Sequence, residues 1–235
     1  MDKIFKREIS LIGENNFKKI NNSHVAVFGV GGVGAFVIEA LVRAGIGKIT
    51  IVDFDVIEIS NLNRQIHTNT ENIGKLKAEE MGKRLKLINP ELEINVINEI
   101  YNIETHDVIF NEKWDYIVDA IDMVSSKLLL IDKANKFNIK IISSMGTANK
   151  IDPSKFLITD IKKTHTCPLA RKMRKSVKEL GIKKLKVLFS TEKPDNFIHD
   201  MNVKGTISFV PSVAGLLIAS EVVKDIIDLG YNYEK

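Results

Sequence analysis

The chain has 235 residues, of which 44% are hydrophobic and 27% are charged, with a formal net charge of +4. These values are typical of one moderate globular domain with a packed core and room for a small appended lobe. Cys167 is the only cysteine, which excludes an internal disulfide or a four-cysteine zinc site within one chain and suits a reducing cytosol. No apolar run is long enough for a bilayer and residues 1–7 form no signal region, so we expect a cytoplasmic protein without membrane contact.

Positive charge is concentrated in one part of the chain. Between residues 162 and 193 there are eleven lysines and arginines but two acidic residues, so the remainder is net negative. Such asymmetry indicates a polyanionic partner at one face. The alternative is a solvated, lysine-rich helix surface, so charge alone does not establish nucleic-acid binding.

The chain begins with one or two short helices within residues 2–20, where we expect Ile4, Ile9, Leu11 and Phe17 to be buried. A strand at 24–28, a glycine loop, a helix at 35–44 and a strand at 48–52 follow. Strand, glycine loop, helix, strand and acidic residue form the dinucleotide-binding pattern.

The glycines of the loop have separate physical tasks in this pattern. Gly29 allows the tight turn out of the strand, Gly31 and Gly32 let the backbone approach a phosphate, and Gly34 lets the helix pack close to the sheet. The helix then offers free N–H groups to an anion. Asp53 lies nineteen residues beyond Gly34, where a carboxylate that binds ribose hydroxyls is expected.

The polar segment after Asp53 indicates more than a dinucleotide. A loop as long as 54–70 is usually functional. It contains Asn61, Arg64 and Gln65, and Lys77 follows about one turn into a helix expected at 75–88. A fixed guanidinium fork and a lysine suit a site that holds a triphosphate and releases pyrophosphate.

The remaining pattern predicts a doubly wound α/β fold with a mostly parallel, Rossmann-like sheet and a small C-terminal α/β extension. We assign residues 1–146 to an ATP-binding adenylation core and 147–235 to the extension with its basic region, which is not clearly a separate domain. The expected later elements are strands at 93–98, 116–119, 140–144, 155–160 and 186–190, helices at 123–137, 168–180 and 211–228, and a polar loop at 195–205.

Several motifs in the same order resemble those of the ubiquitin-activating-enzyme superfamily, whose bacterial members adenylate carboxylates. They are Gly29-Val30-Gly31-Gly32-Val33-Gly34, Asp53-Phe54-Asp55, Asn61-Leu62-Asn63-Arg64-Gln65, Gly74-Lys75-Leu76-Lys77, Asn89-Pro90 and Asp119-Ala120-Ile121-Asp122.

The second half is similar to the tRNA threonylcarbamoyladenosine dehydratases. The matching segments are Ile151-Asp152-Pro153, Thr159-Asp160, Pro168-Leu169-Ala170, Arg174 and Val187-Leu188-Phe189-Ser190-Thr191-Glu192. This resemblance implies ATP-driven cyclisation of the threonylcarbamoyl group on the adenosine beside the anticodon, through an acyl adenylate. It also implies a ligase-type reaction, Mg²⁺ and a homodimer.

The resemblance also implies roles for residues of the glycine loop and the polar segment. Gly32 is expected against the ATP phosphates, together with Gly29, Gly31 and Gly34, and Asp53 against the ribose. Arg64 is expected at the β and γ phosphates, and Lys77 at the α and β phosphates. The alternatives are a strand cap for Asp53 and a surface ion pair for Arg64.

Further assignments also have structural alternatives. Asn61 and Gln65 would position the nucleotide, or else make hydrogen bonds within their loop. Asp122 would hold the magnesium ion, or else cap a helix. Asp55, for the nucleotide site, and Asp119 are weaker candidates, and both could be ordinary polar residues of a loop or a strand end.

The basic helix carries the candidates for tRNA binding, which are Arg171, Lys172, Arg174 and Lys175. Adjacent basic residues on a helix can follow a phosphate backbone. Cys167 could be an acceptor in a thioester route, but we favour a bystander in a substrate loop. His165 is more typical of a loop histidine than of a base.

Three other functions remain as alternatives at this stage. A sulfur-carrier adenylating enzyme usually has two Cys-x-x-Cys pairs for zinc, which this chain lacks. An RNA-binding module that senses nucleotides would bind ATP and tRNA without releasing AMP. A nicotinamide dehydrogenase leaves Arg64 and Lys77 unexplained. A sulfur-transfer partner protein, if one exists, is unknown.

Overall fold

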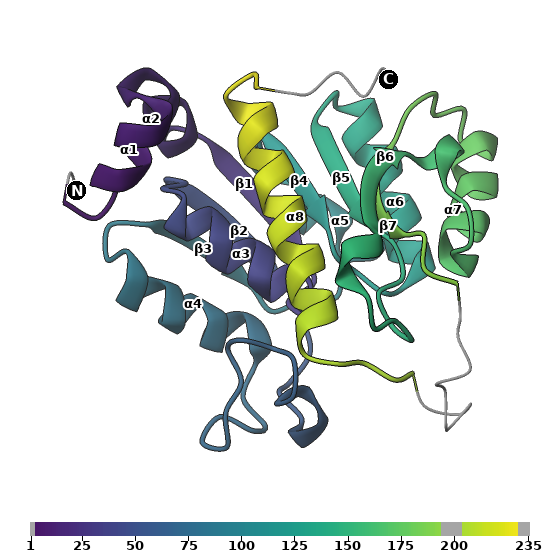
Figure 1. Ribbon diagram of the computed structural model, residues 1–235, viewed down its shortest axis with the longest axis horizontal. Helices are drawn as coiled ribbons and strands as arrows, with labels where there is room; N and C mark the ends of the chain where they lie inside the picture. The colour runs from purple at the N-terminus through teal and green to yellow at the C-terminus, as the bar shows by residue number, and fades with distance from the viewer. Residues whose placement is uncertain (1–2, 194–203, 230–235) are drawn as a thin grey trace.

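A seven-stranded, mostly parallel sheet forms the centre of the molecule (Figure 1). The computed structural model describes residues 3–193 and 204–229. The strand order is β3-β2-β1-β4-β5-β7-β6, and only β6 runs antiparallel, against β7. The expected doubly wound α/β fold is therefore confirmed.

The strands are β1 His24–Phe28, β2 Lys48–Val52, β3 Glu93–Ile97, β4 Tyr116–Asp119, β5 Lys140–Ser144, β6 Phe156–Asp160 and β7 Lys186–Ser190. The helices are α1 Lys6–Ile12, α2 Glu14–Asn21, α3 Gly34–Arg43, α4 Lys77–Ile88, α5 His106–Ile109, α6 Val124–Lys136, α7 Pro168–Glu179 and α8 Phe209–Ile226, with 3₁₀ turns η1 Ile59–Asn61, η2 Pro153–Lys155 and η3 Ile161–Lys163.

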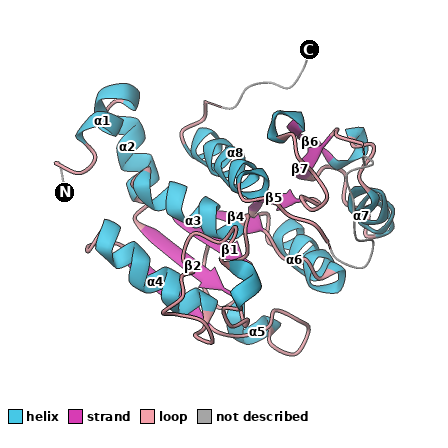
Figure 2. Cartoon of the chain, turned by 60° about the horizontal axis from the view of Figure 1, so that its bottom comes forward, coloured by secondary structure: helices cyan, strands magenta, loops and turns pink. Residues whose placement is uncertain are grey.

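Helices cover both faces of the sheet, because successive strand residues point to opposite sides. On β1, Val25 and Val27 pack with apolar residues of α3, α4 and α8. Ala26 and Phe28 face the other side, where α6 and the segment around Trp114 cover them. Figure 2 shows α3 and α8 on one side of the strands and α6 on the other.

Five strands begin and end at the expected residues, but several helix boundaries differ. The helix expected from 75 starts at Lys77, and the helix expected from Pro211 starts at Phe209. Proline is tolerated there because the first-turn N–H groups have no partner within the helix. The short α5 was not expected, and the loop predicted at 195–205 lies mostly outside the described residues.

The expected burial of the N-terminal helices was wrong at two positions. Ile4 and Leu11 are exposed, whereas Phe5 and Ile20 are buried. Phe5 packs on Phe17, with ring centroids 5.2 Å apart. A short amphipathic segment does not show which of its apolar residues meets the rest of the fold.

The segment after residue 147 continues the same sheet. Strand β7 pairs in parallel with β5, and α8 returns to pack on α3. A Cβ on Gly215 would lie 2.5 Å from the Val33 carbonyl oxygen, so glycine is required where the two helices meet. The assigned boundary at residue 146 stays a prediction. In the described residues, no helix is long and apolar enough to cross a bilayer.

An ion-pair network fastens α8 to the sheet. The Lys186 ammonium lies 2.8 Å from Glu221 and 2.6 Å from Asp225, which also accepts a hydrogen bond from the Tyr116 hydroxyl. Burial lowers the pKa of Lys186, but its hydrogen bonds to both carboxylates outweigh burial, and the pKa lies above its ordinary value. Glu221 is almost fully buried and depends on this lysine as its counter-ion.

We expect Lys186→Met to lower the free energy of unfolding by about 3 kcal/mol at pH 7, because it leaves a buried carboxylate unpaired. Lys184→Met, at an exposed neighbour, should change it by less than about 0.5 kcal/mol. Denaturant titration measures both. Since the pKa of Lys186 is raised on folding, the wild-type advantage should be complete below pH 10.5 and decline above it. Equal stability of the two variants would contradict the network's role.

Candidate functional site

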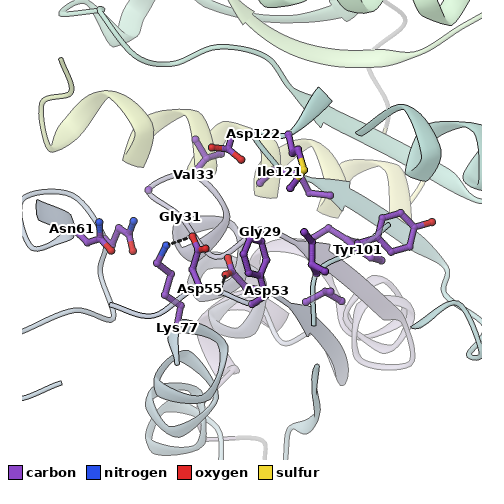
Figure 3. A pocket seen from close by; sticks show the side chains of 18 of the residues that line it. Gly29, Gly31, Val33, Asp53, Asp55, Asn61, Lys77, Tyr101, Ile121 and Asp122 are labelled. Carbon is purple, nitrogen blue, oxygen red and sulfur yellow. Dashed lines mark hydrogen bonds and ion pairs between the residues drawn. The ribbon is translucent and has the colours of Figure 1, made fainter. Parts of the chain in front are cut away.

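A cavity of about 470 Å³ opens at the carboxyl ends of β1, β2 and β4 (Figure 3). The chain winds in opposite directions on the two sides of β1, so this edge is the switch point at which α/β sheets bind ligands. The lining includes the glycine loop, Asp53, Arg64, Lys77 and Asp122. Residues from separate segments of the sequence therefore meet in one place.

The glycines of the loop fall into two groups by their surroundings. Gly29 has φ +93°, and a Cβ there would lie 2.6 Å from the Ala120 carbonyl oxygen. A Cβ on Gly34 would lie 1.8 Å from the Gly29 oxygen. By contrast, a Cβ on Gly31 would meet nothing within 4 Å. Gly29 and Gly34 are required by packing, while Gly31 borders the open cavity.

Gly32 lies where three parts of the site meet. A Cβ there would be 3.1 Å from the Cβ of Pro211 on α8 and 3.4 Å from the Cγ of Arg64. The first turn of α8 therefore backs the glycine loop. The absence of a side chain leaves room for the stem of Arg64.

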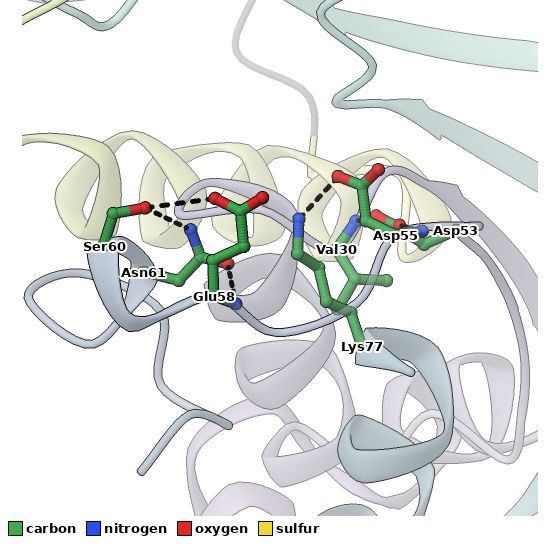
Figure 4. A network of polar contacts seen from close by, with 7 residues as sticks. All are labelled: Val30, Asp53, Asp55, Glu58, Ser60, Asn61 and Lys77. Atoms are coloured by element: carbon green, nitrogen blue, oxygen red, sulfur yellow. Dashed lines mark hydrogen bonds and ion pairs between the residues drawn. The ribbon is translucent and has the colours of Figure 1, made fainter. Parts of the chain in front are cut away.

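Asp53 connects β2 to the glycine loop (Figure 4). Its carboxylate accepts a 2.5 Å hydrogen bond from the Val30 amide and a 2.8 Å bond from the Asp55 amide. Burial raises the pKa of Asp53, and the two amide bonds oppose that rise. The residue therefore organises the loop as well as lining the cavity.

Lys77 points at Asp55 across the cavity floor (Figure 3). The ammonium lies 2.6 Å from the carboxylate, and the lysine side chain is only 9% exposed. Lys77 is the first residue of α4, not one turn inside it as expected. Asp55 thus supplies the counter-ion for a nearly buried cation.

The turn η1 arranges the next part of the site. Asn61 accepts a hydrogen bond from the Glu58 amide at 3.1 Å and donates one to the Ser60 hydroxyl at 3.3 Å. The loop-internal bonding considered for Asn61 is therefore present (Figure 4). Gln65 is buried, and its Oε1 atom has no hydrogen-bond partner among the described residues.

Arg64 has donors left over for a ligand. Its Nη1 atom donates to the Ser60 carbonyl at 2.7 Å and to Asn63 Oδ1 at 2.9 Å. Nη2 and Nε have no partner in the described parts of the chain. The guanidinium is held at one corner and half-exposed at the cavity. No carboxylate among the described residues pairs with it, so the alternative of a surface ion pair finds no support there.

Asp122 and Asp119 differ sharply, although they are three residues apart. Asp122 is exposed, lines the cavity and makes no ion pair or hydrogen bond within the described residues. It is not a helix cap, because Met123 occupies that position of α6. Asp119 is fully buried, 2.9 Å from the Lys127 ammonium. Of these two carboxylates, only that of Asp122 is available to a ligand.

No set of three or more His, Cys, Asp or Glu side chains that could hold a metal occurs in residues 3–193 and 204–229. Magnesium does not require such a set, since it is commonly held by one or two carboxylates together with substrate phosphates.

The basic helix α7 presents Arg171, Lys172 and Lys175 to solvent. Arg174 differs from them, because it is half-buried and its Nη1 atom donates two 2.6 Å hydrogen bonds to Thr164. Three of the four candidates for phosphate contact are thus free at the surface, and the fourth supports the loop before the helix.

Cys167 and His165 occupy that same loop. Cys167 is buried and caps α7, with its sulfur accepting from the Ala170 amide at 3.5 Å. His165 makes an edge contact with Phe189, the ring centroids being 5.2 Å apart. A buried capping thiol agrees better with a bystander than with an acceptor on a thioester route.

Two buried polar residues were missed by sequence reasoning. His67 is buried with both ring nitrogens unpartnered among the described residues, and burial, helped by Lys77 and Arg84, lowers its pKa to about 4. Lys127 is completely buried. A signal existed for Lys127, since it lies on the apolar stripe of α6 that continues through Leu130 and Ala134.

Comparison with known proteins gives close relatives over nearly the whole chain. The tRNA threonylcarbamoyladenosine dehydratase of Bacillus subtilis is 40% identical over 95% of this chain and 94% of its own length. The Escherichia coli protein of that name is 36% identical over 77% of this chain and 71% of its own length.

Solved structures agree with this. That of E. coli tRNA N6-threonylcarbamoyladenosine dehydratase, TcdA, in complex with ATP has a TM-score of 0.89 and 31% identity, covering 97% of this chain and 95% of the other. E. coli MccB with ATP, at 23% identity and a TM-score of 0.69, shares the fold. A model of the ThiF family matches residues 5–235, and the chain belongs to that family.

Proposed function

We propose that this protein uses ATP to dehydrate threonylcarbamoyladenosine in tRNA through an acyl adenylate. The observation that carries this function is that one cavity brings together the open face of Gly31, the free guanidinium donors of Arg64, the ammonium of Lys77 and the carboxylate of Asp122. Relatives named for this reaction, one of them seen with ATP, support it.

The nucleotide would lie across the glycine loop. Gly31 and Gly32 leave room for phosphates, and the N-terminus of α3 adds its positive dipole end. Asp53 would accept hydrogen bonds from the ribose. Gln65 Oε1 would accept a hydrogen bond from the nucleotide, since a buried acceptor without a donor is costly. Asn61 would position the nucleotide from the other side of the cavity.

Arg64 and Lys77 would act on the leaving pyrophosphate. The threonyl carboxylate attacks the α-phosphorus, and the bond from phosphorus to the pyrophosphate oxygen breaks. Arg64 would meet the developing charge with its two free donor positions, and Lys77 would exchange Asp55 for phosphate oxygens.

Ring closure requires no nucleophile from the protein. An atom of the same side chain attacks the activated carbonyl, AMP leaves with the former carboxylate oxygen, and the nucleoside has lost one water. The step is intramolecular, so positioning lowers much of its barrier. This agrees with a chain whose single cysteine is buried. The sulfur-carrier alternative, which relies on cysteines, is therefore less well supported.

Asp122 would hold Mg²⁺, which would neutralise phosphate charge when bound. A single free carboxylate fits an ion that takes its other ligands from phosphates and water.

A homodimer is also part of this proposal. Leu216 and Leu217 on the outer face of α8 are 47% and 36% exposed and would suit contact with a second copy.

The tRNA backbone would lie against α7. Arg171, Lys172 and Lys175 are free of ion pairs in the described residues and point to solvent. Such a surface gives affinity without reading sequence, so the modified base itself would provide the selectivity.

The central test uses ATP, magnesium and tRNA carrying threonylcarbamoyladenosine, followed by digestion and mass analysis of the nucleoside. The wild-type protein should remove one water, and Arg64→Ala should slow this by about a hundredfold or more, because the variant no longer stabilises the charge on the leaving group. An unchanged nucleoside, with AMP formed only when a diglycine-ended carrier protein is added, would favour the sulfur-carrier alternative.

The glycine loop provides a matched pair of variants. Gly31→Ala should fold normally but bind ATP about tenfold more weakly or worse, because its methyl group occupies open cavity space where phosphates would lie. Gly34→Ala should be strongly destabilised even without ATP, because its Cβ meets the Gly29 oxygen. Thermal unfolding and ATP titration separate the two effects. Normal ATP affinity in Gly31→Ala would place the phosphates elsewhere.

The triple variant Arg171→Ala/Lys172→Ala/Lys175→Ala should bind tRNA more weakly and with a shallower salt dependence, by about one unit of slope for each side chain that pairs with a phosphate. ATP binding should be unchanged. Lys6→Ala/Arg7→Ala/Lys18→Ala removes the same charge from exposed sites on α1 and α2. An equal weakening in both triples would show a net-charge effect and contradict the assigned surface.

A further inference from the structure

A buried ion pair lies beneath the loop that carries Asp122. Lys127 on α6 and Asp119 at the end of β4 are both 0% exposed, with their charged atoms 2.9 Å apart. Asp119 also accepts a 2.5 Å hydrogen bond from the Ser143 hydroxyl. Burying two charges brings little net stability compared with apolar packing. The pair is therefore better explained by the backbone that it fixes in place than by a gain in stability.

The pair forms hydrogen bonds with both backbone groups of Ile121. The Lys127 ammonium donates to the Ile121 carbonyl at 3.0 Å, and the Ile121 amide donates to Asp119 at 3.2 Å. The ammonium's remaining bond, 2.9 Å long, goes to the Ser144 carbonyl at the end of β5. All three lysine donors are used, and the loop is tied to two strands.

Ala120, the residue before Ile121, fixes the same loop to the end of β1 and the start of the glycine loop. The Ala120 amide donates to the Phe28 carbonyl at 2.8 Å, and its own carbonyl packs against Gly29. Asp122 follows Ile121 in the chain, and its carboxylate has no partner among the described residues. Its direction into the cavity therefore depends on the backbone that the buried pair holds.

We propose that Lys127, together with Asp119, is the positioning residue of the magnesium site. It holds the loop so that the Asp122 carboxylate faces the place where ATP phosphates and a divalent cation would meet. The inference rests on the proposed function, since it takes Asp122 as the protein ligand of that cation. Residues that orient a metal ligand without touching the metal commonly have this effect on affinity.

The test compares ATP affinity with magnesium and with excess chelator, by calorimetry on the purified protein. In Lys127→Met, affinity without magnesium should be unchanged, while the gain in affinity from magnesium should fall by about tenfold or more. The KM for tRNA should stay the same. A purely structural defect would lower both ATP affinities together.

A second variant covers the case in which Lys127→Met does not fold. Lys127→Met/Asp119→Asn leaves no buried charge uncompensated and keeps an acceptor for the Ile121 amide. Lys186→Met is the matched control, because it removes another paired lysine away from the cavity. It should lower stability without changing the effect of magnesium.

Asp122→Asn separates this inference from the proposed function. If it reduces the magnesium effect and the Lys127 variants do not, the positioning role is wrong while the magnesium assignment stands. If Asp122→Asn leaves the magnesium effect intact, the assignment of the ion to Asp122 is wrong, and the positioning role fails with it. A selective decrease in both confirms the inference.

Discussion

The close approach of two backbone segments is the constraint on which the site depends. The glycine loop after β1 and the turn after β4 touch main chain to main chain, leaving no space for a Cβ on Gly29. The start of α3 is pressed equally close at Gly34. This packing brings the backbone of the glycine loop within reach of the Asp122 loop. Side chains add charge to a shape that the backbone has already made.

The protein itself balances part of the charge in the cavity. Asp55 pairs with Lys77, and backbone amides satisfy Asp53. A charged ligand would therefore exchange one set of partners for another. The free-energy cost of burying charge in this site is lower, because few of its ionised groups lack a counter-ion. Arg64 and Asp122 are exceptions among the described residues: Arg64 has two donor positions left free at the half-exposed edge, and the Asp122 carboxylate has no partner.

Much of the fold followed from the sequence, because strand periodicity, glycine spacing and the order of the motifs are local signals. The strands 24–28 and 48–52 and the arrangement of Asp53, Arg64 and Lys77 around one cavity are examples. What local signals could not supply were side-chain partners that lie on different elements, even where these are close in the chain. The links of Arg174 to Thr164 and of Lys127 to Asp119 depend on packing between elements, as does the choice of Phe5 over Ile4 for burial.

The position of α8 has a consequence for how the protein is made. This helix covers α3, and its first turn backs the glycine loop, yet it is encoded some 175 residues later. During synthesis the apolar surface of α3 waits uncovered until the ribosome has released α8. The nascent chain therefore exposes this apolar face through most of translation, and such a face is prone to aggregation until α8 covers it.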